Sequence, residues 1–558
     1  MNIRNLLHIP PAKYPIRTIL KWLWRSWHGN HTQAVLNAIV GLLSVGISLL
    51  QVWAVQHAID VASGVVEGSL YVAIGLMGGL ILCDFSMSVA TVWIRNVLGI
   101  KAQNRMQQRM LDRILRSVWG GREQFHSGDV LNRLEMDVNN VVNFLTEVIP
   151  NTLSVVAMFV GAFCYLFSMD KWLAVAIVAI LPIFLSVSKL YIGRMRNLTR
   201  QVRESDSKVQ SLLQETLQHR MLIKTLESDD TMIDLLEGQQ GELRRRVMHR
   251  TRFSVFSYLM VNFGFSVGYL LAFFWAAVRL AAHTLSFGGM TAFLQLVNRI
   301  QKPARNLVNL VPTFVSVFTA AERLMELEEN PLEEQGDAVE MPSPCGIRLR
   351  NVTYGYDDAE NNVIEHLDFD FKPGTCTGVK GETGAGKTTL IRMLLALVAP
   401  KEGQIEIYHG DRSERLSPLH RCNFVYVPQG NTLLSGTIRD NLLLGKVDAT
   451  DEELEDVLQQ SCADFVFDLP DGLDTVCGEQ GAGLSEGQAQ RIGIARSLLR
   501  PGSILVFDEA TSALDLDTER ELLQHILSSH HKTVIFITHR PAVLDYCNQI
   551  LQINKIPS

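Results

Sequence analysis

The residues best suited to chemistry form a glycine-rich run, GETGAGKT, from Gly381 to Thr388. The run fits the pattern G-x-x-x-x-G-K-[ST], in which successive backbone N–H groups surround nucleotide phosphates. We expect Lys387 to reach the β- and γ-phosphates and the Thr388 hydroxyl to bind Mg²⁺. A strand-like segment, Thr375–Val379, precedes the run, and a helical pattern, Leu390–Leu397, follows it. A strand, then this loop, then a helix is the arrangement in which the pattern binds phosphate.

A second candidate lies downstream, where the apolar run Ser503–Phe507 ends in Asp508 and Glu509. Such a run is typical of a buried parallel strand, whose carboxyl end lies at the edge where ligands bind. Asp508 would bind Mg²⁺ there, and Glu509 would polarise the attacking water as a general base. A strand end with two solvated acids is the alternative, and the phosphate loop upstream favours the hydrolytic site.

The residues after the phosphate loop resemble those of ATP-binding-cassette (ABC) proteins. The run LSEGQ, Leu484–Gln488, is similar to the signature motif of that family. The resemblance implies that Ser485, Gly487 and Gln488 act on a partner's nucleotide across a dimer interface. Glu486 departs from the commonest pattern, which has glycine there, so we expect a working signature with altered ATPase kinetics.

The same resemblance gives roles to further positions. Tyr356 resembles the aromatic residue that stacks on adenine, Gln429 the glutamine that links Mg²⁺ to the membrane domain, and His539 the switch histidine at the γ-phosphate. Each of these has a plain structural alternative when taken alone. The implied catalytic residues are Lys387, Glu509 and His539, and the implied metal ligands are Thr388, Gln429 and Asp508. The implied nucleotide-binding residues are Tyr356, Gly381, Thr383, Gly384, Ala385, Gly386, Lys387, Thr388, Thr389, Gln429, Ser485, Gly487, Gln488 and Asp515.

Long apolar runs fill the first half of this 558-residue chain, which is 47% hydrophobic. Most runs reach the length of about 20 residues that crosses the hydrocarbon core of a bilayer. They predict six membrane spans, against the alternative of core helices in a large soluble protein. The runs are Val35–Ala58, Leu70–Ile94, Leu145–Phe167, Trp172–Ile192, Phe253–Val278 and Met290–Phe318.

Basic residues indicate the orientation of these spans. Lys and Arg are frequent in the N-terminal segment and between spans two and three and spans four and five, whereas Ala62–Ser69 has none. The positive-inside rule therefore predicts that both termini are cytoplasmic. The expected location is the inner (cytoplasmic) membrane, which the chain would cross several times. Helical periodicity in Ile100–Asn143 and Gly193–Arg252 predicts that spans two to five continue below the membrane. Their turns, at about 128–140 and 215–226, are expected to meet the ATPase half.

The expected fold is multidomain: an all-α six-span transmembrane domain, then an α/β P-loop ATPase domain with a helical subdomain. An interfacial segment, 1–30, alternates basic and aromatic residues and precedes the transmembrane domain, 31–326. A linker rich in Glu and Pro, 327–345, leads to the ATP-binding cassette, 346–558. The segments Ser127–Arg133 and Ala320–Leu324 resemble those of exporter-type ABC proteins.

Composition and resemblance together limit the function. The net charge of −7 argues against a nucleic-acid binder, and eight cysteines without a C-x-x-C pair indicate reduced cytosolic thiols. The resemblance implies a half-transporter that uses ATP and Mg²⁺ and dimerises with a second copy or a paralogous half-transporter. It would export a peptide, lipid or small amphipathic molecule across the bilayer by alternating access. An ATP-gated channel or a non-pumping regulator on the same scaffold is the alternative.

A possible substrate site lies in the sixth span, where Arg299, Lys302 and Arg305 recur at three-residue spacing. This spacing places the three side chains on one face of a helix. Charges at membrane depth usually face a cavity, so the face could bind an anionic substrate. The alternative is that this part of the span lies near the cytoplasmic headgroups, where the side chains snorkel.

Overall fold

The computed structural model describes residues 14–29, 31–119, 127–356, 361–478, 483–528 and 532–555. Within helices, the side chains of residues 33, 173, 176–193, 196, 261 and 302–312 lie outside this description. The chain divides into two compact units, one of Met1–Leu111 with Leu131–Glu328 and one of Asp112–Val130 with Glu329–Ser558.

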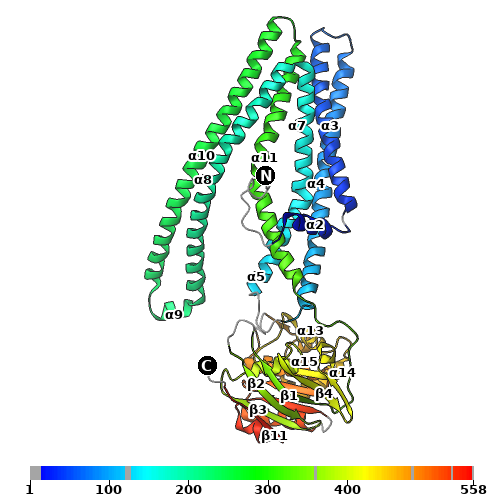
Figure 1. The fold of residues 1–558 in the computed structure, drawn as a ribbon, viewed down its shortest axis with the longest axis vertical. Helices are drawn as coiled ribbons and strands as arrows, with labels where there is room; N and C mark the ends of the chain where they lie inside the picture. The colour runs from blue at the N-terminus through cyan, green and yellow to red at the C-terminus, as the bar shows by residue number, and fades with distance from the viewer. Residues whose placement is uncertain are drawn as a thin grey trace. The chain divides into compact units, whose positions relative to one another are not determined.

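The first unit is built from long helices (Figure 1). Helix α8 lies along α10 as an antiparallel pair, and α3 packs on α7. A short helix, α2 (Ile16–Ser26), precedes the long ones and buries Ile19, Trp22 and Leu23. The long helices are α3 (His31–Ala62), α4 (Leu70–Leu115), α7 (Ile149–Met169), α8 (Lys171–Gln218), α10 (Asp229–Ala281) and α11 (Phe287–Glu329). Shorter elements are η1 (Arg133–Asp137), α6 (Val138–Asn143), η2 (Phe144–Val148) and α9 (Arg220–Thr225), and α5 (Ser127–Asn132) spans the boundary between the two units.

Apolar surface on these helices is largely exposed, as expected where lipid is the solvent. Four stretches of the described residues are long and apolar enough to cross a membrane: Ala34–Ala62, Leu70–Leu115, Gly128–Met169 and Asp229–Ala281. Only 6% to 24% of the most apolar part of each is buried inside the structure. The predicted membrane domain is therefore confirmed, whereas the count of six spans is not. The fourth and sixth apolar runs lie in α8 and α11, whose central side chains are outside the described part.

The connection after α4 differs from the sequence-based expectation. We expected a turn at about 128–140, but these residues are helical, from α5 through η1 into α6. The chain instead leaves the helix at 116–119, where the Val118 N–H donates to the Pro331 carbonyl at 2.8 Å. The Glu333 N–H donates to the Arg116 carbonyl at 2.9 Å. These bonds satisfy backbone N–H and C=O groups of residues 116–118 without a helix. Helical periodicity alone therefore wrongly predicted that the helix continues here.

The turn between α8 and α10 is confirmed. It lies at α9, within the predicted segment 215–226, and none of the α9 side chains is buried.

The second unit contains two main sheets. The five-stranded sheet is parallel, with the order β11-β3-β10-β9-β6, and the four-stranded sheet is antiparallel, with the order β2-β1-β4-β5. A two-stranded ribbon joins β7 and β8. The strands are β1 (Gly346–Tyr354), β2 (Ile364–Phe371), β3 (Cys376–Gly381), β4 (Glu402–His409), β5 (Arg412–Arg415), β6 (Phe424–Val427), β7 (Gly436–Thr437), β8 (Val476–Cys477), β9 (Ile504–Asp508), β10 (Thr533–Ile537) and β11 (Gln549–Ile553).

The helices of the second unit fall into two groups. Side chains of α13 (Ile438–Leu443), α14 (Asp451–Gln460) and α15 (Glu486–Leu498) share one apolar cluster, which forms a helical subdomain. The remaining helices are α12 (Lys387–Leu394), α16 (Leu516–Leu527) and α17 (Pro541–Leu544), with 3₁₀ turns η3 (Pro418–Asn423), η4 (Asp464–Val466) and η5 (Gly472–Asp474). The predicted α/β ATPase architecture is confirmed.

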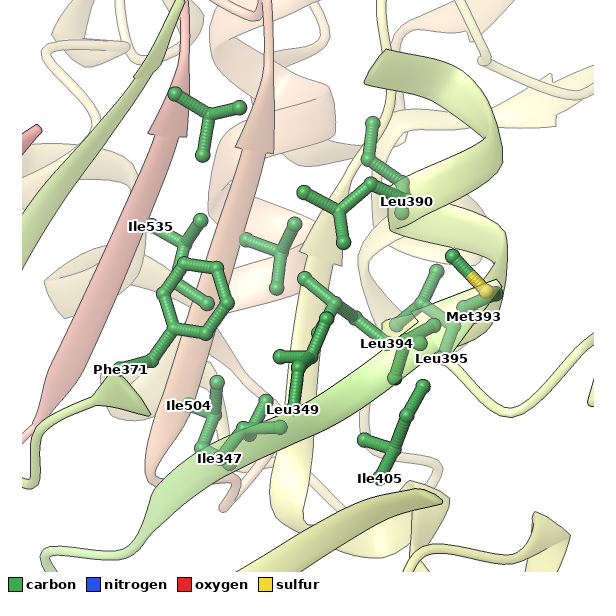
Figure 2. Close-up of a cluster of buried hydrophobic side chains, with 14 of the residues drawn as sticks. Ile347, Leu349, Phe371, Leu390, Met393, Leu394, Leu395, Ile405, Ile504 and Ile535 are labelled. Carbon is green, nitrogen blue, oxygen red and sulfur yellow. The ribbon is translucent and has the colours of Figure 1, made fainter. Parts of the chain in front are cut away.

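Helix α12 is held between the two main sheets (Figure 2). Its Leu390 and Leu394 side chains are fully buried among side chains of both sheets, such as Leu349 of β1 and Ile535 of β10. Burying a leucine side chain contributes about 1.5–3 kcal/mol, so this packing fixes the helix firmly. The glycine-rich loop at its N-terminus is fixed with it.

Candidate active site

Four parallel strands bring the candidate residues to one edge of the five-stranded sheet. Strand β3 ends at Gly381, where the phosphate loop begins, and β9 ends at Asp508. Strand β10 ends two residues before His539, and β6 ends two residues before Gln429. The carboxyl ends of neighbouring parallel strands share an edge, which is where ligands bind in such sheets.

The phosphate loop has a backbone that only glycine adopts readily. Gly384 and Gly386 have φ of 83° and 100°, in the left-handed region. A Cβ on Gly381 would lie 2.7 Å from the Ile553 carbonyl oxygen, so a side chain is excluded there. Lys387 begins α12, donates from Nζ to the Gly381 carbonyl at 2.8 Å, and also contacts Nε2 of His539. The helix N-terminus and the ammonium group together favour an anion at this loop.

Other residues of the loop differ in exposure. Thr383 and Thr388 are exposed, whereas Ala385 is buried and donates its N–H to the Glu382 carbonyl at 3.1 Å. Thr389 is 4% exposed. The loop therefore exposes the side chains of Thr383 and Thr388, whereas the Ala385 methyl group packs inward.

The Asp508 carboxyl is partly buried at the end of β9. Its Oδ2 accepts a hydrogen bond from the Tyr426 hydroxyl at 3.3 Å. Burial raises the pKa of Asp508, and the bond from Tyr426 opposes that rise. Thr388, Gln429 and Asp508 offer hydroxyl, amide and carboxylate oxygens, the hard donors that Mg²⁺ prefers.

Glu509 is held by its backbone and by two side chains. Its φ of 49° lies in the left-handed region, which costs a non-glycine residue about 1 kcal/mol. The Glu509 N–H donates to the Ile537 carbonyl at 2.9 Å, which fixes this turn against β10. Gln429 Nε2 donates to Oε2 of Glu509 at 3.1 Å, and His539 Nε2 lies 3.8 Å from Oε1. Gln429 and His539 therefore constrain the orientation of the Glu509 carboxylate from two sides.

Tyr356 is tied to α12 by its hydroxyl. The Tyr356 hydroxyl and Thr389 Oγ1 share a hydrogen bond at 3.0 Å, and Arg392 Nη1 donates to the same hydroxyl at 2.9 Å. The guanidinium of Arg392 also lies 4.4 Å from the centre of the Trp119 ring. Sequence reasoning missed Arg392 and Tyr426, although one lies on the helix that follows the loop and the other lies three residues before Gln429.

The signature residues form a helix cap. Ser485 caps α15: its Oγ accepts from the Gln488 N–H at 3.2 Å, and its N–H donates to Gln488 Oε1 at 2.9 Å. A Cβ on Gly487 would lie 2.9 Å from the Ala513 carbonyl oxygen, so glycine allows close approach of that loop. Within the described residues, neither Ser485 nor Gln488 bonds to the phosphate loop of the same chain.

Asp515 and Arg540 order the segment after Glu509. Asp515 caps α16: its Oδ2 accepts from the Thr518 N–H at 3.0 Å, and this bond holds the pKa of Asp515 below its usual range. Arg540 donates to the Ser512 carbonyl at 2.9 Å. It also pairs with the buried carboxylate of Glu519 at 2.9 Å. Sequence reasoning missed Arg540, and its position directly after His539 is the only signal that could have found it.

The candidate substrate residues are described only in part. Arg299 is half-buried on α11, and the side chains of Lys302 and Arg305 lie outside the described part of the chain.

Comparison with known families accounts for most of the chain. Residues 35–303 match the family model of the ABC transporter transmembrane region, and residues 364–512 match that of the ABC transporter. The chain belongs to the ABC transporter family. This ABC transporter carries its transmembrane region and its ATPase domain in one polypeptide, and it is an ATP-hydrolysing transporter.

Relatives of this ABC transporter match it over nearly its whole length. A candidate multidrug export ATP-binding/permease protein of Staphylococcus aureus is 26% identical, covering 93% of this chain and 92% of its own. The ATP-dependent lipid A-core flippase of Bordetella avium is 29% identical, covering 85% of this chain and 81% of its own. The ATP-bound structure of a bacterial Atm1-family ABC exporter has the same fold, with a TM-score of 0.78 at 20% identity. That match covers 94% of this chain and 95% of the exporter.

Proposed function

We propose that this chain is one half of a dimeric exporter that moves a peptide, lipid or small amphipathic molecule outward across the cytoplasmic membrane. The observation that carries the proposal is the meeting of Lys387, Gln429, Asp508, Glu509 and His539 at one sheet edge. The other unit of the same chain is built from apolar helices. The names of the Staphylococcus and Bordetella relatives support an amphipathic cargo for this chain.

Binding of ATP would begin at the phosphate loop. The loop N–H groups would hold the phosphates, and Lys387 would exchange the Gly381 carbonyl, now 2.8 Å away, for phosphate oxygens. Thr388, Gln429 and Asp508 would hold Mg²⁺, which when bound neutralises charge on the phosphate oxygens. Asp508 must be ionised for this role, although burial raises its pKa.

Hydrolysis would depend on Glu509. Gln429 keeps the carboxylate oriented through its 3.1 Å bond, so Glu509 can take a proton from the attacking water. The water oxygen would then bond to the γ-phosphorus, with ADP as the leaving group. His539, 3.8 Å from Glu509, would contact the γ-phosphate as negative charge develops on it.

The signature residues support a dimer with a second copy or a paralogous half-transporter. Ser485 and Gln488 lie at the N-terminus of α15, a 13-residue helix whose dipole favours an anion. In this arrangement they would serve the nucleotide held by the other subunit. The apolar α9 side chains Met221 and Leu222, 82% and 55% exposed, would also contact that subunit.

Six spans, with both termini and the ATPase domain cytoplasmic, complete the proposal. ATP would hold the two ATPase domains together and hydrolysis would release them, shifting the spans between two states. Arg299, Lys302 and Arg305 would attract an anionic group of the cargo, unless they lie at the headgroups. Substituting all three by Gln should then weaken stimulation of ATPase by anionic compounds, and unchanged transport would exclude this role.

The decisive experiment measures ATP turnover by the full chain in lipid nanodiscs against a panel of peptides, lipids and drugs. Glu509→Gln is the control, because it removes the general base and keeps the binding residues. We expect substrate-stimulated turnover in the parent and a loss of about 100-fold or more in the variant, with ATP binding retained. Turnover that no compound alters, together with ATP-dependent ion currents, would instead indicate a gated channel.

A further inference from the structure

Two cysteine sulfurs lie in contact at the amino-terminal end of β3, the end opposite the phosphate loop. Sγ of Cys376 lies 3.3 Å from Sγ of Cys547, and the Cys376 thiol donates to the Cys547 sulfur. All eight cysteines of the chain fall within the described residues, and no other two of their sulfurs are in hydrogen-bond contact there. The neighbouring backbone is well paired: the Asn548 N–H donates to the Cys376 carbonyl at 2.8 Å. The pairing of β3 with β11 therefore holds the backbones of the two cysteines close together.

The two cysteines differ in a way that suits a redox pair. Cys376 is 5% exposed within the sheet, whereas Cys547 is half-buried in the connection between α17 and β11. The thiol hydrogen of Cys376 stabilises negative charge on the Cys547 sulfur, which lowers the pKa of Cys547 and raises that of Cys376. A half-buried thiol of lowered pKa beside a second, more protected thiol is the arrangement of an attacking and a resolving cysteine.

The position of the pair connects it to the phosphate loop. Cys376 begins β3, which ends five residues later at Gly381. Cys547 follows α17, which begins two residues after His539. Lys387 of the phosphate loop contacts His539. The segment that leads from Cys376 to the loop and the segment that leads from Cys547 back to His539 therefore meet at the candidate active site.

We propose that Cys376 and Cys547 form a reversible disulfide on exposure to peroxides, and that this bond slows ATP hydrolysis. The effect on rate rests on the proposed ATPase, whereas the formation of the bond does not. Disulfides of cytosolic proteins are usually transient and regulatory, which agrees with the reduced thiols that the cysteine pattern predicts.

The chemistry needs one two-electron oxidant, here hydrogen peroxide. The Cys547 thiolate attacks a peroxide oxygen, the O–O bond breaks, and hydroxide leaves and takes up the thiol proton as water. The resulting sulfenic acid on Cys547 is attacked by the Cys376 sulfur, which releases its proton as the S–O bond breaks and a second water leaves. Two thiols and one peroxide thus give one disulfide and two waters, and a dithiol reductant reverses the change by exchange.

The bond would move backbone that the active site uses. A disulfide is about 2 Å long, so the two sulfurs must approach by about 1 Å and draw β3 toward the connection before β11. Misplacement of about 1 Å can cost an enzyme up to about 100-fold in rate. Because the change is relayed through five residues of β3, we expect a loss of about tenfold.

The test uses the full chain in nanodiscs, reduced, desalted and then treated with hydrogen peroxide. Peptide mass spectrometry without reductant should show a fragment linking Cys376 to Cys547, and ATPase should fall about tenfold and recover with dithiothreitol. Cys376→Ser and Cys547→Ser should keep their activity in peroxide. Cys422→Ser is the matched control, because Cys422 is half-buried and donates to a backbone carbonyl as Cys547 does, but no second cysteine sulfur among the described residues is in hydrogen-bond contact with it; this variant should be inactivated like the parent.

Two results would overturn the proposal. One is the absence of the linked peptide in oxidised parent protein, which needs no variant to fold. The other is equal inactivation of the parent and both serine variants, which would place the sensitive group elsewhere. A parent that forms the linked peptide but lacks ATPase when reduced would support the disulfide and contradict the proposed function, so the two failures are distinguishable.

Discussion

The hydroxyl of Tyr426 should set the pH at which this ATPase loses activity. Tyr426→Phe removes only the hydroxyl whose hydrogen bond reaches Asp508 Oδ2 at 3.3 Å. Hydrogen bonds to charged groups contribute about 1.5–3 kcal/mol, and one this long lies at the low end. The bond favours the ionised carboxylate, so its loss should raise the pKa of Asp508 further.

The sign of the effect follows from the role of the carboxylate. In the proposed mechanism Asp508 would bind Mg²⁺ only when ionised, so activity should be lost as the pH falls through its pKa. Raising that pKa in Tyr426→Phe should move the acid limb of the profile to higher pH. Activity at alkaline pH should stay unchanged, because there the carboxyl is ionised in both proteins.

The assay is ATP turnover against pH, from about 5 to 9, at subsaturating Mg²⁺ in nanodiscs, where the proton and the metal compete for Asp508. Tyr408→Phe is the matched control, because the Tyr408 hydroxyl donates to Asp370 Oδ1 at 2.7 Å in the four-stranded sheet. Burial there raises the pKa of Tyr408 to about 12. An acid limb that stays in place in Tyr426→Phe, or moves equally in Tyr408→Phe, would refute the reasoning.

Three further substitutions test the surroundings of the site. Gly487→Ala places a Cβ 2.9 Å from the Ala513 carbonyl oxygen, so we expect at least about a tenfold loss of turnover with unchanged binding of a fluorescent ATP analogue. Arg540→Ala leaves the carboxylate of Glu519, 1% exposed, without its 2.9 Å partner and should destabilise the ATPase domain by about 2–3 kcal/mol in thermal unfolding; adding Glu519→Gln should restore part of this. Glu486→Gly removes a carboxylate expected near the partner's γ-phosphate and should raise ATP affinity several-fold; equal turnover and affinity would remove any role for Glu486.

Local sequence patterns predicted the individual parts of the ATPase domain. The loop Gly381–Thr388 lies between β3 and α12 as expected, because the glycine-rich run needs a left-handed backbone that few other residues adopt. The run ending in Asp508 is a buried parallel strand, since an apolar segment of that length satisfies both faces of a covered sheet. Such features depend on a few neighbouring residues, so they can be read without the tertiary structure.

Packing between distant segments was not predictable in the same way. Periodicity suggested a helical continuation through 116–119, but backbone bonds to Pro331 and Glu333 hold these residues extended. Those partners lie more than 200 residues away in the sequence, so no local sequence pattern indicates that the contact forms. The hydrogen bond from Arg392 to the Tyr356 hydroxyl could not be predicted from the sequence for a related reason. A guanidinium group on a helix can reach many different neighbours.

By itself, the sequence determined the local elements: a glycine-rich loop, an acid pair at a strand end and apolar helices follow from residue types at fixed spacing. The tertiary structure alone decided which of these groups act together. Parallel pairing of β3, β10, β9 and β6 brings Gln429 and His539 to Glu509, and pairing of β3 with β11 brings Cys376 to Cys547. The physical reason is that hydrogen bonds and thiol contacts act over about 3 Å, whereas the pairing that creates them joins segments up to 171 residues apart.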